Sequence, residues 1–185
     1  MITITETALP GVLEITPRRF ADSRGHFSES WNRARLAEHG IDLDFVQDNH
    51  SHSAQAHTVR GLHYQAPPFA QDKLVRVLRG RILDVAVDIR PGSPHFKRWV
   101  AVELTAEAGN QLLVPVGFLH GFVTLEPETD VAYKVTAPYA PEADGAVRFD
   151  DPDLGVDWGI DPESAVLSDK DAAAPGFADL TNPFT

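Results

Sequence analysis

Two neighbouring stretches in the middle of the chain alternate between apolar and charged positions. They run over Lys73–Arg79 and Arg81–Ile89 and are separated by Gly80. Alternation with a period of two is typical of strands with one buried face, and glycine between two such runs favours a turn. The pattern therefore predicts a β-hairpin over residues 73–89.

Shorter stretches with the same alternation precede and follow this hairpin. Asn32 can cap a helix over residues 32–39, and Gly40 can end it. For residues 115–122, which include His120, the sequence instead predicts a tight turn. Many short strands with one short helix favour a sandwich or small barrel. The remaining predicted strands are Ile2–Glu6, Val12–Pro17, 26–31, Phe45–His50, 59–65, Trp99–Leu104, Gln111–Pro115 and Val131–Ala137.

Composition fits a single domain over residues 1–185. The chain has 14 prolines, 13 glycines and no cysteine, which excludes disulfides and thiolate chemistry. Its N-terminus does not resemble a signal peptide, and no stretch approaches the roughly 20 apolar residues that span a membrane. We therefore expect a soluble, cytoplasmic protein with no membrane partner.

Charge is unevenly distributed along the chain. The net charge of −11 argues against non-specific nucleic-acid binding. Residues 60–98 nevertheless hold eight of the sixteen Lys and Arg residues and only three acids, whereas residues 142–185 hold eleven acids and two basic residues. A solvated basic face is one interpretation. The other is a local site for a small phosphorylated ligand inside an acidic protein.

Candidate chemistry gathers on the strand that precedes the hairpin. If residues 61–65 are extended, Gly61, His63 and Gln65 point to one face, and Arg60 joins them only if a bulge near Gly61 turns it. Six of the eight histidines lie in predicted turns, loops or helix ends, where a solvent-facing role is expected. His63 and His120 differ because each follows a glycine-containing turn beside a predicted strand.

Gly61-x-His63 and Pro115-x-Gly117-x-x-His120 resemble the two sequence motifs of the cupin barrels. Cupins usually bind a metal with a second histidine and a glutamate from the first motif. Gln65 stands at that second-histidine position here, and residues 66–73 contain no glutamate. Two histidines are a poor metal cage, so the resemblance implies a jelly-roll barrel with short peripheral helices and no bound metal or other cofactor.

A longer series of motifs resembles the dTDP-4-dehydrorhamnose 3,5-epimerase family over about residues 10–171. Each motif is weak alone, but eight in the same order are a specific signal. They are Asp22-x-Arg24-Gly25-x-Phe27-x-Glu29, Gln47-Asp48-Asn49-His50-Ser51, Arg60-Gly61-Leu62-His63-Tyr64-Gln65, Gln71-x-Lys73-Leu74-Val75-Arg76-Val77, Asp84 to Arg90, Pro115-x-Gly117-Phe118-x-His120-Gly121-Phe122, Tyr133-Lys134 with Tyr139, and Leu167 to Asp171.

This resemblance implies a cofactor-free epimerisation at C3 and C5 of dTDP-4-dehydro-6-deoxy-D-glucose, on the way to dTDP-L-rhamnose. His63 matches the base and Asp171 the carboxylate that orients its imidazole. Lys73 matches the cation beside the enolate oxygen, and Tyr133 matches the acid on the opposite face of the sugar.

The resemblance also implies a set of substrate contacts and a homodimer. Residues 1–31 are expected at the dimer interface, where Arg24 and Glu29 serve the neighbouring site, and residues 138–185 are expected to cover the barrel. Asp144 departs from the family, many members of which carry a glutamate after the tyrosine. The matched contacts are Arg24, Glu29, Gln47, Asn49, Arg60, His120, Tyr139, Asp144 and Lys170.

Three alternatives stay open at this point. The same residues suit an epimerase that inverts only C3 or only C5 in a secondary-metabolite pathway. A metal-dependent cupin enzyme and a non-catalytic sugar-binding cupin are the other two.

Overall fold

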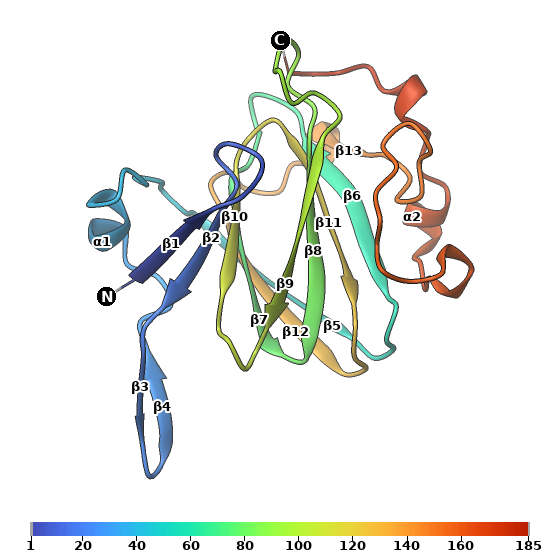
Figure 1. Cartoon of the computed structure of the whole chain (residues 1–185). Coiled ribbons are helices and arrows are strands. Elements are labelled where there is room, and N and C mark those ends of the chain that lie inside the picture. The colour runs from blue at the N-terminus through green and yellow to red at the C-terminus, as the bar shows by residue number, and fades with distance from the viewer. Residues whose placement is uncertain (1, 185) are drawn as a thin grey trace.

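The protein is built from two antiparallel β-sheets that pack face to face (Figure 1), as described for residues 2–184 by a computed structural model. This is the all-β, jelly-roll architecture that the sequence predicts. The six-stranded sheet has the order β1 (Ile2–Glu6), β2 (Leu13–Pro17), β10 (Gln111–Val114), β7 (Lys73–Arg79), β12 (Thr129–Val135), β5 (Gln47–Ser53). The five-stranded sheet has the order β13 (Asp144–Ala146), β6 (Val59–Gln65), β11 (Phe118–Thr124), β8 (Arg81–Asp88), β9 (Trp99–Thr105).

Helical segments are short and lie outside the two sheets. Helix α1 (Arg33–Ala37) begins where expected, because the Asn32 side chain accepts a hydrogen bond from the Arg35 N–H at 3.2 Å. Helix α2 (Asp169–Ala172) and three 3₁₀ turns, at Pro141–Ala143, Pro162–Ser164 and Phe177–Asp179, follow in the C-terminal part. None of the helices in residues 2–184 is long and apolar enough to cross a membrane.

Apolar side chains fill the space between the sheets. Val75 and Val131 from the six-stranded sheet meet Ile82, Leu104 and Phe122 from the five-stranded sheet, and each is at most 4% exposed. Strands β7 to β12 contribute alternate side chains to this layer, so the alternation read from the sequence corresponds to their inward faces.

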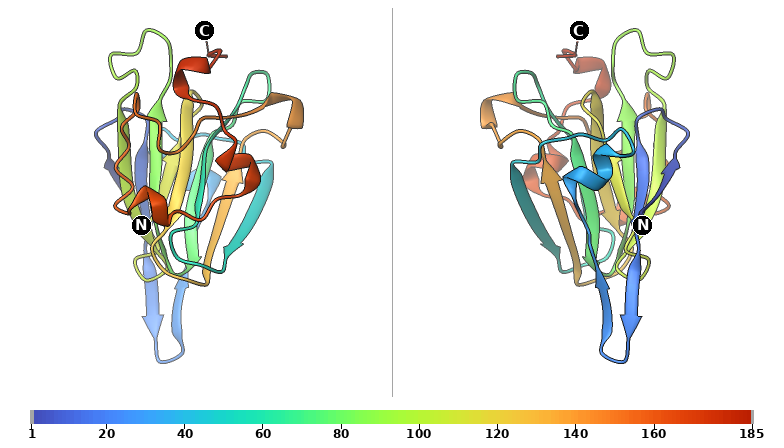
Figure 2. Two further views of the ribbon diagram at one scale, coloured as in Figure 1. Left: turned by 90° about the vertical axis from the view of Figure 1, so that its right-hand side faces the viewer. Right: turned by 90° about the vertical axis from the view of Figure 1, so that its left-hand side faces the viewer.

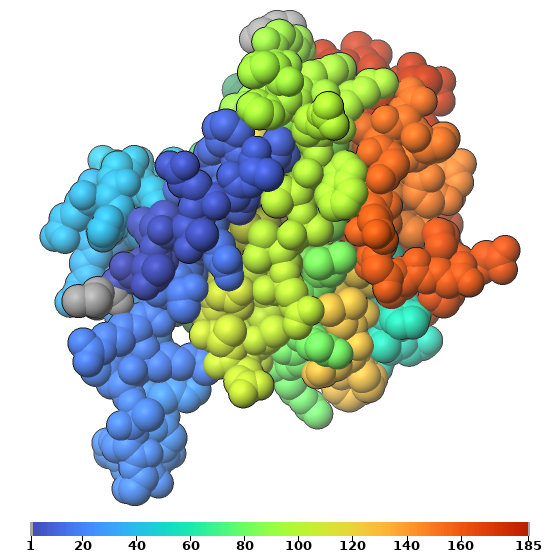
Figure 3. Space-filling model, viewed as in Figure 1, coloured from blue at the N-terminus to red at the C-terminus, as the bar shows by residue number. Residues whose placement is uncertain are grey.

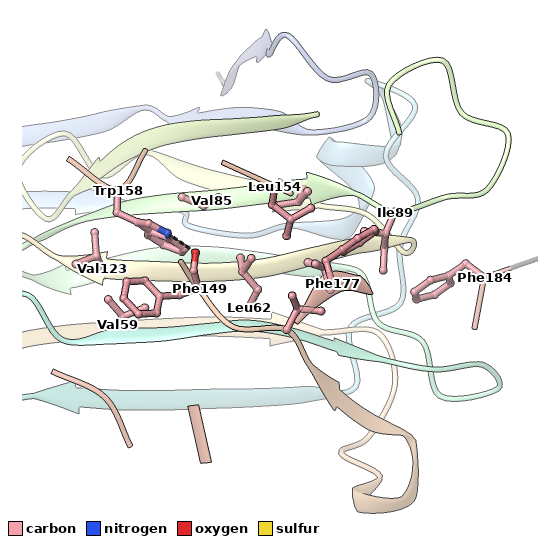
Figure 4. Close-up of a cluster of buried hydrophobic side chains, with 13 residues drawn as sticks. Val59, Leu62, Val85, Ile89, Val123, Phe149, Leu154, Trp158, Phe177 and Phe184 are labelled. Atoms are coloured by element: carbon pink, nitrogen blue, oxygen red, sulfur yellow. Dashed lines mark hydrogen bonds between the residues drawn. The ribbon is translucent and has the colours of Figure 1, made fainter. Parts of the chain in front are cut away.

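The chain after β13 covers the outer face of the five-stranded sheet (Figure 2). Its aromatic residues pack on strands β6, β8 and β11 in a second apolar cluster, which includes Phe149, Trp158, Phe177 and Phe184 (Figure 4). The indole N–H of Trp158 donates to the Phe149 carbonyl at 2.8 Å. The central strands β8 and β11 of this sheet are therefore buried on both faces along most of their length.

The predicted hairpin over residues 73–89 is wrong in its pairing. Strand β7 has the predicted bounds, but it pairs with β10 and β12, whereas β8 pairs with β9 and β11 in the other sheet. Gly80, with φ +80°, turns the chain from one sheet to the other. A hairpin and a chain that turns from one sheet to the other both show alternating positions on either side of a glycine. The sequence pattern therefore did not distinguish them.

The predicted turn over residues 115–122 is also wrong in its second half. Residues from Phe118 onward form β11, a central strand in which all seven residues are buried. Because apolar side chains face both the inner core and the C-terminal segment, β11 shows no alternation between apolar and polar positions. Only residues 115–117 form the turn before it.

One hairpin stands apart from the barrel. Within the described part of the chain, strands β3 (Arg19–Asp22) and β4 (Gly25–Ser28) pair only with each other, and they project away from the two sheets (Figure 3). The cross-strand pair Phe20 and Phe27 is 51% and 70% exposed.

Candidate active site

Two adjoining cavities, of about 220 and 170 Å³, share the side chains of His63, Lys73, Tyr133 and Lys170. Residues from both sheets and from α2 line them. The cavities bring together eleven of the thirteen residues that the sequence singles out. These are Gln47, Asn49, Arg60, His63, Lys73, His120, Tyr133, Tyr139, Asp144, Lys170 and Asp171.

A bulge in β6 places Arg60 and His63 in the same cavity. His63 is opposite His120 on β11, but Arg60 is opposite Phe122, so β6 has one extra residue between the two pairs. The extra residue is accommodated at Gly61, where a Cβ would come within 2.5 Å of the Gly121 Cα. This is the condition under which the sequence predicted that Arg60 would join His63.

The imidazole of His63 is held by a carboxylate. Its Nε2 lies 2.5 Å from Oδ1 of Asp171, which is only 6% exposed. Burial would raise the pKa of Asp171, but the hydrogen bonds from His63 and Ser168 outweigh burial and keep this pKa below its usual value. Asp171 is therefore ionised at neutral pH, and it fixes the His63 tautomer with the proton on Nε2 and a free lone pair on Nδ1.

A second histidine–carboxylate pair lies beside the first. Nε2 of His120 is 2.7 Å from Oδ1 of Asp84, and neither residue is more than 6% exposed. Burial lowers the pKa of His120, although Asp84 opposes the shift. The His120 imidazole is therefore neutral at pH 7, and as a neutral ring it donates from Nε2 to Asp84.

Lys73 supplies positive charge within this cluster. Burial lowers the pKa of Lys73 to about 8, against the opposing attraction of Asp84 and Asp144. The side chain is consequently still an ammonium at pH 7, but one that is poorly solvated and available to a new oxygen partner.

Tyr133 approaches from the facing sheet. It lies on β12, while His63 lies on β6, and both side chains line both cavities. Burial raises the pKa of Tyr133, with Arg60 opposing the shift and Asp144 adding to it. The phenol therefore stays protonated at neutral pH and can act as an acid.

Further polar side chains lie around His63 and Tyr133. The Arg60 guanidinium donates to the Ser53 hydroxyl at 3.3 Å and to the His52 carbonyl at 2.9 Å, which fixes its orientation. Lys170 forms an ion pair with Asp144, and the same carboxylate oxygen accepts from the Tyr139 hydroxyl at 3.1 Å. Asp144 thus holds a lysine and an exposed aromatic ring together.

Arg24 and Glu29 do not reach these cavities within one chain. Arg24 lies at the tip of the β3–β4 hairpin with its side chain 87% exposed, and it pairs with Asp22 at 2.6 Å. Glu29 follows the hairpin and lies 3.1 Å from Arg35.

The structure adds to the site a residue that the sequence analysis quoted within a motif but to which it assigned no role. Ser51 lines the larger cavity, and its buried hydroxyl has no hydrogen-bond partner among residues 2–184. The predicted strand stopped at His50, whereas β5 continues to Ser53. Extending the alternation by one step would have placed Ser51 on the face of Gln47 and Asn49.

The residues present do not fit a metal. Within residues 2–184, no three His, Asp or Glu side chains are arranged to hold one. The Gln65 amide is bonded to the backbone instead: it donates to the carbonyls of Phe69 (2.7 Å) and Pro138 (3.2 Å) and accepts from the Ala140 N–H (2.9 Å).

Comparison with known proteins gives a consistent result. The family model for dTDP-4-dehydrorhamnose 3,5-epimerase matches residues 6–179. A dTDP-4-dehydrorhamnose 3,5-epimerase of Sinorhizobium fredii is 50% identical over 172 residues, which are 92% of this chain and 87% of that protein.

Solved structures show the same similarity. The dTDP-6-deoxy-D-glucose-3,5-epimerase RmlC of Legionella pneumophila, in complex with dTDP-4-keto-L-rhamnose, has a TM-score of 0.92 and 44% identity; the match covers 97% of this chain and 95% of that one. ChmJ, a 3′-monoepimerase of Streptomyces bikiniensis in complex with dTDP-quinovose, has a TM-score of 0.86 and 33% identity, with 93% and 86% covered.

Proposed function

The chain belongs to the dTDP-4-dehydrorhamnose 3,5-epimerase family, and we propose that it inverts C3 and C5 of dTDP-4-dehydro-6-deoxy-D-glucose to give dTDP-4-dehydro-L-rhamnose. The reaction is an isomerisation within dTDP-L-rhamnose biosynthesis. The observation that carries the assignment is the position of an imidazole and a phenol on facing sheets around one cavity, with an ammonium beside them.

Proton transfer at each carbon follows from these positions. His63 Nδ1 removes the proton next to the C4 ketone, and the electron pair moves onto the C4 oxygen to form an enolate. Lys73 stabilises that oxyanion, which commonly lowers such a barrier by about 3–4 kcal/mol. Tyr133 then donates its proton to the opposite face of the carbon, and solvent restores the protonation of both side chains. Both carbons flank the same ketone, so one oxyanion site serves both inversions.

The nucleotide is expected to occupy the part of the site that is rich in positive charge. Arg60 and Lys170 suit pyrophosphate oxygens, since arginine presents paired N–H donors. The ring of Tyr139 is 56% exposed and is proposed to stack on thymine. Gln47, Asn49 and His120 are proposed to contribute further polar groups around the ligand.

Two substitutions test the catalytic assignment. His63→Ala and Tyr133→Phe should each abolish turnover while the protein still binds dTDP, because neither change removes Arg60, Lys170 or Tyr139. Unchanged turnover in either variant would rule out the role proposed for that residue.

We also expect the protein to act in the cytoplasm.

We further propose that the protein acts as a homodimer in which the β3–β4 hairpin completes the neighbouring site. An isolated two-stranded hairpin is marginally stable in water, yet this one projects beyond the barrel (Figure 1) and exposes Phe20, Phe27 and Arg24. A second copy would bury the two aromatic rings, deliver the Arg24 guanidinium to the pyrophosphate and place Glu29 among the polar groups around the ligand.

Co-expression of two inactive variants tests this sharing. In a hybrid dimer of Arg24→Ala and His63→Ala chains, one site would combine the intact His63 with the intact Arg24. Random pairing would then restore about one quarter of the wild-type sites. If Arg24 instead serves its own chain, every site carries a lesion and activity stays at the level of the separate variants.

A further inference from the structure

The segment that follows β12 is not part of a strand, but its backbone groups still form hydrogen bonds. Strand β12 ends at Val135, and the four residues that follow Thr136 belong to neither sheet. Their backbone groups are nevertheless paired with side chains. The Ala137 carbonyl accepts from the Gln71 amide at 2.8 Å, and the Tyr139 N–H donates to the Gln47 amide oxygen at 3.0 Å.

Gln65 supplies the central part of this arrangement. Its amide oxygen accepts from the Ala140 N–H and its nitrogen donates to the Pro138 carbonyl, on either side of Tyr139. The side chain is 5% exposed, so these bonds are made away from water. An amide is suited to this position because it donates and accepts at once, whereas a carboxylate only accepts.

The segment carries Tyr139, whose ring lies at the edge of the smaller cavity. The residue is fixed at its backbone by Gln47 and at its hydroxyl by Asp144, while 56% of its surface remains exposed. A ring held at both ends and open between them is a preformed stacking surface, and binding to such a surface requires little further ordering.

We propose that Gln65 and Gln71, together with Gln47, are positioning residues that hold residues 137–140 and thereby keep the Tyr139 ring ready for the nucleotide base. The proposal deepens the assigned function and depends on Tyr139 contacting the base. It also gives Gln65 a role: at the position where cupins usually carry a metal-binding histidine, this chain uses an amide to organise the nucleotide end of the site.

A double-mutant cycle on dTDP affinity tests the proposal. The variants are Gln65→Leu, Tyr139→Ala and their combination, and the probe is dTDP itself, measured by calorimetry. Gln65→Leu should weaken dTDP binding about ten-fold and raise KM in parallel, because a loosened ring must be ordered on binding. kcat at saturating substrate should change much less. In the Tyr139→Ala background, Gln65→Leu should cause little further loss.

A control separates positioning from general destabilisation. Asn182→Leu removes another side-chain amide that donates to a backbone carbonyl, that of Ile89 at 2.5 Å, outside both cavities. It should lower the melting temperature without changing dTDP affinity. If Gln65→Leu does not fold, Gln71→Leu removes a single bond to the same segment and enters the same cycle.

The outcomes distinguish this proposal from the assigned function. Additive losses of dTDP binding free energy from Gln65→Leu and Tyr139→Ala would show that Gln65 does not act through Tyr139. That result would rule out the positioning role and leave the epimerase assignment unaffected. Unchanged dTDP affinity in Tyr139→Ala would remove the stacking role on which the proposal rests.

Discussion

Lys73 should impose an alkaline limit on the reaction. Burial lowers the pKa of Lys73 to about 8. A group with this pKa is about nine-tenths protonated at pH 7 and about one-tenth protonated at pH 9, and only the ammonium stabilises the enolate. We therefore expect kcat/KM to fall about ten-fold between these pH values, because kcat/KM reports the ionisation of the free enzyme.

The limit should move when substrate is bound. Bound substrate would add the negative charge of its pyrophosphate to the site that Lys73 lines, which favours the ammonium and should raise the pKa of Lys73 in the complex. The decline in kcat should consequently begin at a higher pH than the decline in kcat/KM. Burial has also raised the pKa of Tyr133, so the phenol ionises at a higher pH than the Lys73 ammonium.

Initial rates measured from pH 6 to 10 would show this decline. Lys73→Arg keeps a positive charge throughout that range, so its remaining activity should show no decline near pH 8. Lys134→Arg is the matched control on the neighbouring strand, outside both cavities, and should keep the wild-type profile. A decline at the same pH in Lys73→Arg would assign the titration to another group and refute the reasoning.

Three further substitutions follow from the geometry. Asp171→Asn removes the charge that fixes the His63 tautomer and should lower kcat by about 10²- to 10⁴-fold with dTDP affinity retained, as related triads suggest; an undiminished kcat would contradict this. Ser51→Ala removes a buried hydroxyl that has no partner within residues 2–184 and that we expect to hydrogen-bond the substrate; it should lower kcat/KM about three- to ten-fold, the value of one neutral hydrogen bond, yet raise the melting temperature. Gly61→Ala should destabilise the fold by about 2–4 kcal/mol, since its Cβ would meet Gly121; Gly92→Ala, also at positive φ but in open space, should cost clearly less in thermal unfolding.

Local alternation predicted most of the strands because most of them have one buried face. Strand β7 has the bounds that the sequence indicated, and Asn32 caps the first helix as expected. The failures share a physical cause. Strand β11 is buried on both faces, so it shows no alternation. One of these faces is covered by the C-terminal segment, which lies more than twenty residues further along the chain.

The site was predictable in its residue types but not in its geometry. Arg60 shares a cavity with His63 only because β6 carries an extra residue, which in turn requires the close approach of Gly61 and Gly121. Such a bulge depends on pairing with β11, which no local pattern encodes. Pairing also decided that the Gly80 turn is a corner between sheets rather than a hairpin.

Asp144 illustrates a departure that only the structure interprets. The resemblance implies a glutamate in many members of the family, and this chain carries a side chain one methylene shorter. Its carboxylate pairs with Lys170 and accepts from Tyr139, so its effect on a ligand can be transmitted through those two residues.

Deuterium incorporation tests the central claim most directly. The protein is incubated in D₂O with dTDP-4-dehydro-6-deoxy-D-glucose, and label at C3 and C5 is counted in the product by NMR. If one enolate site serves both carbons, label appears at both positions with inverted configuration, and Tyr133→Phe, which lacks the acid, gives no inverted product. Label confined to one carbon would indicate a single-position epimerase, and label at neither carbon would contradict the proposed chemistry.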